Sequence, residues 1–248
     1  MKKSISQFQF SWSYVIIFAS CICILIYKYN SEHPKAEWDT SPDNIVVSSS
    51  NMFEEIDYGY IPDFQVWGDG HIVWVEHDQD FTRKVYEGYL SQNQLKEIIE
   101  QFVDAGYYKW FGNKNSHPVN VSIGLLNSYK QNSFDANGKI SKLAEYLESG
   151  AGVDAKEFIP TVGYLYVFPI KKTAYKNTNV IPIQWAGNKY ESNFENFERI
   201  FPNGKEITGE ELDFLWHIVN HSPFIEANGD VYWIAVEIPK VSFSITVR

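Results

Sequence analysis

One segment near the C-terminus carries the side chains with the clearest potential for metal chemistry. His217 and His221 are four residues apart, so on an α-helix they share one face, which also carries Asp213. Two imidazoles and a carboxylate on one face could bind a divalent cation. The glutamate of an H-E-x-x-H zinc protease is absent, because Ile218 follows His217. The alternative is a solvent-exposed face without a ligand, opposite an apolar stripe.

A run of aromatic residues is a candidate binding surface. Tyr107, Tyr108 and Trp110 follow one another so closely that regular structure cannot turn all of them inward. Exposed tyrosine and tryptophan rings bind proteins and sugars well, because they present large flat faces at little entropic cost. These three residues therefore predict a binding surface, although most aromatic side chains must lie in the core of a chain with 17% Phe, Trp and Tyr.

Acidic residues suggest two further kinds of chemistry, and each has an ordinary structural explanation. Asp78 and Asp80 resemble half of a calcium loop, but the turn glycine and the other oxygen ligands do not follow. Glycoside hydrolysis needs two carboxylates across a cleft, but pairs such as Glu210 and Glu211 arise by chance in a chain with 31 acidic residues. Motifs for phosphate, dinucleotide or serine-hydrolase chemistry are absent, and we predict no cofactor.

The charge of the chain excludes nucleic acid as an expected partner. The sequence has 21 basic and 31 acidic residues, with a formal net charge of −10. Binding to nucleic acid depends on basic patches that release counterions from the phosphate backbone. An acidic surface would repel that backbone, so we predict a protein or glycan partner instead.

An apolar segment at residues 10–27 predicts a membrane anchor. It contains no charged residue, and as a helix it would be about 27 Å long, just enough to span a hydrocarbon core of about 30 Å. Lys2 and Lys3 precede it, which predicts a cytoplasmic tail at residues 1–9 and a C-terminal domain outside the cytoplasm. The preferred interpretation is a single-pass signal anchor in the cell membrane. A cleaved secretion signal is less favoured, because no Ala-x-Ala site follows the segment.

Both cysteines of the chain lie in this apolar segment, at Cys21 and Cys23. The domain beyond it therefore has no disulfide, no cysteine zinc ligand and no cysteine nucleophile. The sequence Phe18-Ala19-Ser20-Cys21 resembles a lipobox, which makes lipidation at Cys21 a third possibility for the N-terminus. It departs from that pattern because Phe replaces the usual Leu and the apolar run continues after Cys21.

Three segments have the signals of amphipathic helices. A capping box opens two of them, formed by Ser91 with Gln94 and by Thr208 with Glu211. Apolar residues recur at intervals of three or four along each segment. We predict helices at residues 92–105, about 140–148 and 209–220.

The remaining segments predict an antiparallel sheet. Gly68-Asp69-Gly70 and Asn228-Gly229-Asp230 are turn sequences typical of β-hairpins. Hairpins that alternate with single helices favour an α+β fold, with mainly antiparallel sheets and about three helices on one face, after one N-terminal transmembrane helix. Strands are predicted at residues 63–67, 71–76, 84–89, 119–126, 128–134, 163–170, 224–227, 231–238 and 242–247. A polar tether at 28–44 would lead into this domain at 45–248, which is one unit or two subdomains at 45–150 and 160–248.

Residues 63–150 resemble a module of uncharacterised bacterial exported proteins and lipoproteins. The resemblance rests on the hairpin Gly68-Asp69-Gly70, the helix opened by Leu90-Ser91 with Leu95, and the following Gly106-Tyr107-Tyr108. It implies an exported domain and no particular activity. The layout also resembles small bacterial metalloprotease inhibitors.

Three functions are consistent with these features. The preferred one is a membrane-tethered, non-enzymatic interaction or structural module outside the cytoplasm. The second is an inhibitor or regulator of an exported enzyme, acting through a rigid loop for which residues 112–118 are the candidate. The third is a carboxylate-based hydrolase, which would require a pocket with two facing acidic side chains, one with a raised pKa.

Overall fold

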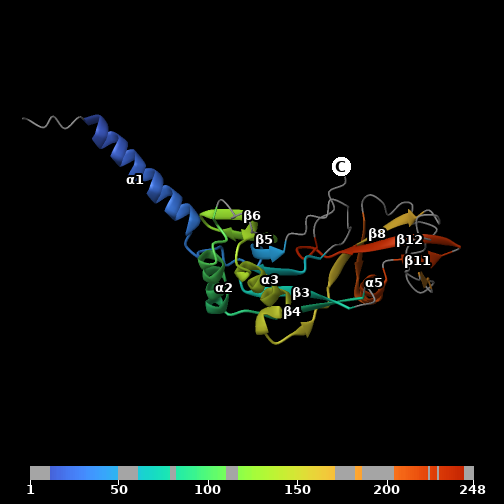
Figure 1. The fold of residues 1–248 in the computed structure, drawn as a ribbon. Coiled ribbons are helices and arrows are strands. Elements are labelled where there is room, and N and C mark those ends of the chain that lie inside the picture. The colour runs from blue at the N-terminus through green and yellow to red at the C-terminus, as the bar shows by residue number, and fades with distance from the viewer. Residues whose placement is uncertain are drawn as a thin grey trace, which may run out of the picture.

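The computed structural model is an α+β protein with four α-helices and two mostly antiparallel sheets in the part of the chain that it describes (Figure 1). One helix projects from one end of the body, and the two sheets follow each other along its length. The predicted α+β class is confirmed. The structure describes residues 12–49, 61–78, 82–109, 117–170, 182–185, 204–222, 224–227 and 229–242.

The first sheet has seven strands in the order β6-β5-β1-β2-β3-β4-β7, all paired antiparallel. Its best-predicted part is the β2–β3 hairpin, where Asp69 Oδ1 accepts a hydrogen bond from the His71 backbone N at 3.0 Å and Gly70 has a φ of +94°. The positive φ explains why glycine ends this turn. The strands are β1 (Ile45–Ser49), β2 (Phe64–Trp67), β3 (His71–His77), β4 (Arg83–Tyr89), β5 (His117–Leu125), β6 (Ser128–Asp135) and β7 (Lys156–Glu157).

Two helices, α2 (Gln92–Asp104) and α3 (Lys139–Glu148), cover one face of this sheet. The predicted capping box of α2 is present in full, since Ser91 and Gln94 bond each other's backbone N–H groups. The stripe of α2 and the inner face of α3 pack on alternate residues of the central strands, such as Phe64, Ile72 and Trp74. This first core is closed by a short 3-10 turn at Gly150–Gly152.

The second sheet has five strands in the order β10-β8-β12-β11-β9, with one parallel pair, β9 with β11. Its helix α5 (Gly209–His221) begins at Thr208 as predicted, but the Thr208 side chain makes no capping bond. Glu211 instead forms an ion pair with Lys205, with Oε1 3.2 Å from Nζ. The strands are β8 (Val162–Ile170), β9 (Ile183–Gln184), β10 (Lys205–Thr208), β11 (Phe224–Ala227) and β12 (Asp230–Glu237).

A second core joins the two sheets. The other face of the first sheet contributes Val73, Val75 and Val85, which belong to the same cluster as α5 and the inner residues of β8 and β12. The prediction that all three helices lie on one face is therefore wrong, because α2 and α3 pack on the first sheet and α5 packs on the second. Successive side chains of β3 point alternately into the first core and the second core, so both faces of this strand are buried.

The N-terminal helix α1 (Trp12–Glu32) extends away from the body (Figure 1). Among the described residues, no helix is long and apolar enough to cross a membrane.

The predicted tether at residues 28–44 is not a free segment along its whole length. After α1, Trp38 Nε1 donates to the Gly68 carbonyl at 3.1 Å, and the Glu37 carbonyl accepts from the Leu126 N–H at 2.8 Å. A side chain at Gly68 would meet the Asp39 carbonyl oxygen, 1.9 Å from an ideal Cβ. The glycine of the first hairpin therefore lets this segment lie directly on the turn.

Candidate functional site

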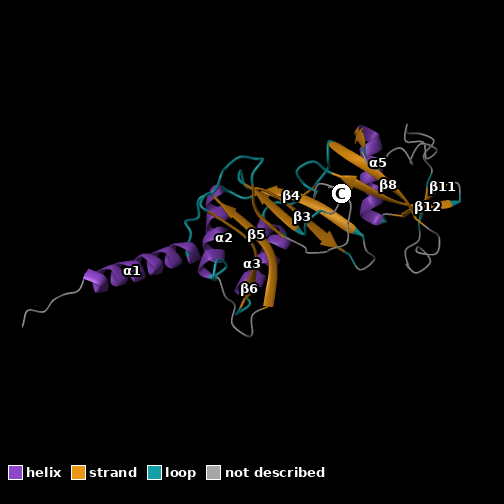
Figure 2. Cartoon of the chain, turned by 90° about the horizontal axis from the view of Figure 1, so that it is seen from above, coloured by secondary structure: helices purple, strands orange, loops and turns teal. Residues whose placement is uncertain are grey.

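A pocket of about 510 Å³ lies between the edge of the first sheet at β4 and helix α5. Figure 2 shows α5 beside the ends of β3 and β4 that point away from α1. Pockets of a few hundred cubic ångströms are typical of ligand sites. The wall from β4 and β7 consists of residues 82–86, Glu157 and the following Ile159, and the wall from α5 consists of Asp213, Trp216, His217, Asn220 and His221.

Arg83 is the most firmly positioned charged group of this pocket. Its Nε donates to Asn220 Oδ1 at 2.7 Å, and its guanidinium carbon lies 5.8 Å from the centre of the Trp216 ring. Trp216 is itself buried and packs edge-on against Phe158, with ring centres 6.1 Å apart. Asn220 thus holds one edge of the guanidinium and Trp216 contacts one of its faces, so the orientation of the group is fixed. A fixed, planar guanidinium is well suited to bind a carboxylate.

The predicted metal set lines this same pocket. Asp213, His217 and His221 are exposed on α5, opposite its buried stripe, so the predicted exposed face is confirmed. The two imidazole centres are 4.1 Å apart, and His221 Nδ1 donates to the His217 carbonyl at 2.7 Å. Throughout the part of the chain that the structure describes, no three His, Cys, Asp or Glu side chains are grouped to hold a metal ion.

Charges of both signs surround the pocket. Arg83 and the exposed Lys84 lie on the β4 wall, whereas Glu157 and Asp213 are exposed on the other sides. The exposed carboxylates are solvated, but Arg83 is partly buried and fixed by its neighbours. Arg83 is therefore an oriented cation within a mixed polar rim.

The aromatic binding surface predicted at residues 107–110 is not formed by its tyrosines. Tyr107 and Tyr108 are buried in the first core, and burial raises the pKa of both phenols. The Tyr107 hydroxyl lies 2.6 Å from the Val121 carbonyl oxygen and 2.7 Å from that of Lys130. Trp110 lies outside the described residues. The two tyrosines are structural, because the first core surrounds their rings and carbonyl oxygens of β5 and β6 lie next to their hydroxyls.

The carboxylate chemistry required by a hydrolase is not found in this pocket. Among the described residues, the acidic group with a raised pKa is Glu148 on α3, where burial and then the charges of Asp63 and Glu145 disfavour its ionised form. Neither Glu148 nor Asp63 lines the pocket between β4 and α5. Residues 112–116 of the predicted inhibitory loop are outside the described residues, and His117 and Pro118 begin β5.

The sequence analysis did not predict one pair of polar residues. His71 and Glu87, on β3 and β4, are joined by a hydrogen bond of 3.0 Å between Nε2 and Oε2. They line a separate hollow of about 380 Å³. The side-chain alternation along each strand carries a weak signal for this pair, but only the register of β3 on β4 brings the two residues together.

Comparisons with known proteins gave no family assignment. No protein-family model matches the chain, and no curated protein and no solved structure matches it. The resemblance of residues 63–150 to a module of exported bacterial proteins therefore stays a prediction.

Proposed function

We propose that this chain is a membrane-anchored, non-enzymatic binding protein whose domain lies outside the cytoplasm. Its pocket between β4 and α5 would receive an acidic group of a protein partner. The single observation that supports this function is the fixed guanidinium of Arg83, held by Asn220 and Trp216 at the wall of the pocket.

The recognition step follows from the chemistry of arginine. A guanidinium matches a carboxylate in shape and charge, and a bond between two ionised groups is roughly twice as strong as a neutral hydrogen bond. Because Arg83 is already oriented, little side-chain freedom would be lost when a partner binds. The neighbouring Lys84 adds a second, exposed cation.

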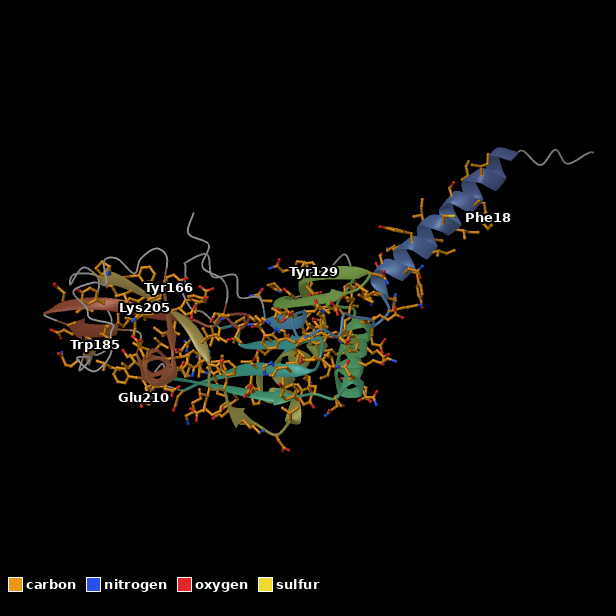
Figure 3. All side chains as sticks on the ribbon, turned by 180° about the vertical axis from the view of Figure 1, so that it is seen from behind. Phe18, Tyr129, Tyr166, Trp185, Lys205 and Glu210 are labelled. Carbon is orange, nitrogen blue, oxygen red and sulfur yellow. The ribbon has the colours of Figure 1, made fainter. Side chains whose placement is uncertain are left out.

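The anchoring role is supported by the surface of α1. Phe18 and Leu25 are 69% and 65% exposed, and large apolar side chains point outward around the helix from Ile16 to Tyr27. Figure 3 shows Phe18 on the helix, clear of the body of the protein. A helix that is apolar on every side is ordinarily buried in a core or in a membrane. Lys2 and Lys3 favour a cytoplasmic N-terminus.

A charge at the middle of α1 is expected to weaken membrane retention. The change Ile22→Asp costs about 3–4 kcal/mol if this position lies in hydrocarbon, because the favourable contribution of isoleucine is also lost. The full chain should then shift from the membrane pellet to the supernatant after alkaline carbonate extraction. Tyr29→Asp, nearer the polar end of the helix, is the matched control and should change retention much less. Complete release of the unaltered chain by carbonate would contradict the anchor.

Loss of the Arg83 charge is expected to weaken partner binding at the β4–α5 pocket. A photo-cross-linking amino acid at position 217 of the full chain, expressed in its host membrane, should give one discrete adduct. Because charge-assisted hydrogen bonds contribute about 1.5–3 kcal/mol, Arg83→Gln should reduce the adduct yield about tenfold or more.

Two controls make this experiment specific. Lys96→Gln removes an exposed cation on α2, far from the pocket lining, and should leave the adduct yield unchanged. The thermal unfolding midpoint of Arg83→Gln should show that the domain is still folded. An adduct that persists in the folded Arg83→Gln protein would show that the pocket does not recognise its partner through this charge.

A further inference from the structure

The imidazole of His71 is held by two stacked aromatic rings and one hydrogen bond. The rings of Trp67 and Tyr89 stack on it, each with its centre 5.0 Å away and inclined by 26° and 30°. Its Nε2 donates to Glu87 Oε2 at 3.0 Å. A carboxylate that accepts from one nitrogen sets the tautomer, so the other nitrogen, Nδ1, is left as an acceptor in the neutral ring.

This pair faces a hollow and is not sealed in the core. The side chains of His71 and Glu87 are 20% and 32% exposed. Polar pairs within reach of solvent contribute only about 0–1 kcal/mol to stability even when both groups are charged, so stabilisation alone is a weak reason for this arrangement. The other walls of the hollow of about 380 Å³ are largely apolar and come from Pro42, residues 158–162 and residues 238–241.

Both members of the pair keep hydrogen-bonding capacity for a ligand. Among the described residues, no hydrogen bond engages His71 Nδ1 or Glu87 Oε1. Both atoms can accept a hydrogen bond from a hydroxyl group. Glu87 also lines a second hollow of about 490 Å³, together with the 66% exposed Tyr89. The two hollows therefore share one carboxylate, beside an exposed aromatic face.

The charges around Glu87 argue against an ionic ligand. Lys156 lies opposite Glu87 in the β4–β7 ladder and lines the second hollow, so a cationic ligand there would meet its ammonium group. Lys240 lines the first hollow, where it is paired with Asp43. An anionic ligand would meet Glu87 and, in the second hollow, Asp154. A neutral ligand avoids both penalties.

We infer that His71, Glu87 and Tyr89 form a second binding site, which takes a neutral, hydroxyl-rich ligand of the glycan class. Hydroxyl groups donate to Glu87 and His71, and the apolar face of a sugar ring packs on Tyr89. Because two hollows share Glu87, the site fits an oligosaccharide better than a single sugar. This site is separate from the β4–α5 pocket and does not depend on the function proposed for it.

The test is binding of neutral oligosaccharides to the full chain in detergent micelles. An array of neutral, acidic and basic glycans gives the ligand, and calorimetric titration with the best neutral oligosaccharide gives its Kd. We expect the Glu87→Gln and Tyr89→Ala proteins each to bind this oligosaccharide at least tenfold more weakly. Lys96→Gln, on the exposed face of α2, should bind it as the unaltered chain does. Unfolding midpoints verify that each variant is folded.

Each other outcome overturns the inference. These outcomes are an array without a neutral hit, hits confined to charged glycans, or an unchanged Kd in folded Glu87→Gln and Tyr89→Ala. The photo-adduct at position 217 separates this result from the proposed function. If glycan binding fails while the Arg83-dependent adduct persists, the second site is wrong and the proposed function stands.

Discussion

Replacing Gly150 with alanine is expected to destabilise the protein strongly, because two independent costs fall on this residue. Its φ is +78°, and an ideal Cβ would lie 2.5, 2.7 and 2.8 Å from three atoms of the Trp74 indole. A left-handed conformation costs an L-residue about 1–2 kcal/mol, and over-packing of a core costs about 1–3 kcal/mol. Trp74 is fully buried and has little room to move. We expect a loss of about 3 kcal/mol in the free energy of unfolding.

The variant Gly138→Ala separates the two costs. Gly138 has a similar φ of +73°, but nothing lies within 4 Å of its ideal Cβ. It should therefore lose only the conformational part, about 1–2 kcal/mol. Urea unfolding followed by tryptophan fluorescence gives both values. Equal losses in the two variants would show that contact with Trp74 does not constrain position 150.

The elements that could be predicted from the sequence are those defined by neighbouring residues. The bounds of α2 follow from Ser91, Gln94 and an apolar stripe, and all of these act within one or two turns of the helix. The start of α5 was predicted by the same reasoning, but its capping bond is absent. There Glu211 has a competing partner, Lys205, which enters from β10. The capping sequence therefore predicted where α5 begins, but it did not predict which hydrogen bonds and ion pairs form there.

The position of the helices could not be predicted, because it depends on how the sheets pack. Nothing in the apolar stripe of α5 distinguishes the face covered by α2 and α3 from a second sheet. The structure separates them because alternate residues of β3, such as Trp74 and Val75, are buried in different cores. A strand with both faces buried has a continuous apolar sequence. That sequence does not show which elements pack on each face of the strand.

The two tyrosines after α2 show why their part of the predicted binding surface is wrong. Consecutive side chains diverge in a regular helix or strand, and this argument placed at least one ring outside. Gly106, with a φ of +88°, ends the helix in an irregular turn. Both Tyr107 and Tyr108 then reach the core with ring planes inclined by 81°. Because the backbone is irregular here, the rule that consecutive side chains diverge does not apply, and both rings can be buried.

The candidate site lay beyond sequence reasoning for a related reason. Arg83 and Asn220 are separated by 137 residues, and the chain between them contains most of both sheets. The sequence did identify His217 and His221 as polar residues on an exposed face of α5. It could not show that this face lies opposite β4, where Asn220 holds the guanidinium of Arg83, and the metal site on this face stays a prediction.

The buried tyrosines also predict that stability falls steeply in alkaline solution. Burial raises the pKa of Tyr107 and Tyr108 above the ordinary value of 10.0. Above pH 10 the unfolded chain would therefore release protons that the folded protein retains, which favours unfolding. Each such group lowers the free energy of unfolding by about 1.4 kcal/mol per pH unit until its folded pKa is reached. The two tyrosines together should give a slope of about −3 kcal/mol per pH unit.

One partly buried lysine acts in the opposite direction over a lower range of pH. Burial lowers the pKa of Lys130 from 10.5, so its contribution to stability rises with pH and is complete near pH 10.5. Tyr166 reinforces the tyrosine effect up to its pKa of about 12, which is raised by burial and by the Glu237 carboxylate. The interval from pH 10.5 to 12 therefore isolates the tyrosines.

Urea unfolding at several pH values within that interval measures the slope, and absorbance at 295 nm follows tyrosine ionisation. Tyr108→Phe should reduce the steepness of the slope by about 1.4 kcal/mol per pH unit, because one titrating group is removed. Tyr129→Phe, at a 70% exposed position on β6, is the matched control and should leave the slope unchanged. If Tyr108→Phe leaves the slope as steep as before, the Tyr108 phenol already reaches solvent in the folded protein, and the binding surface predicted at residues 107–110 would have to be reconsidered.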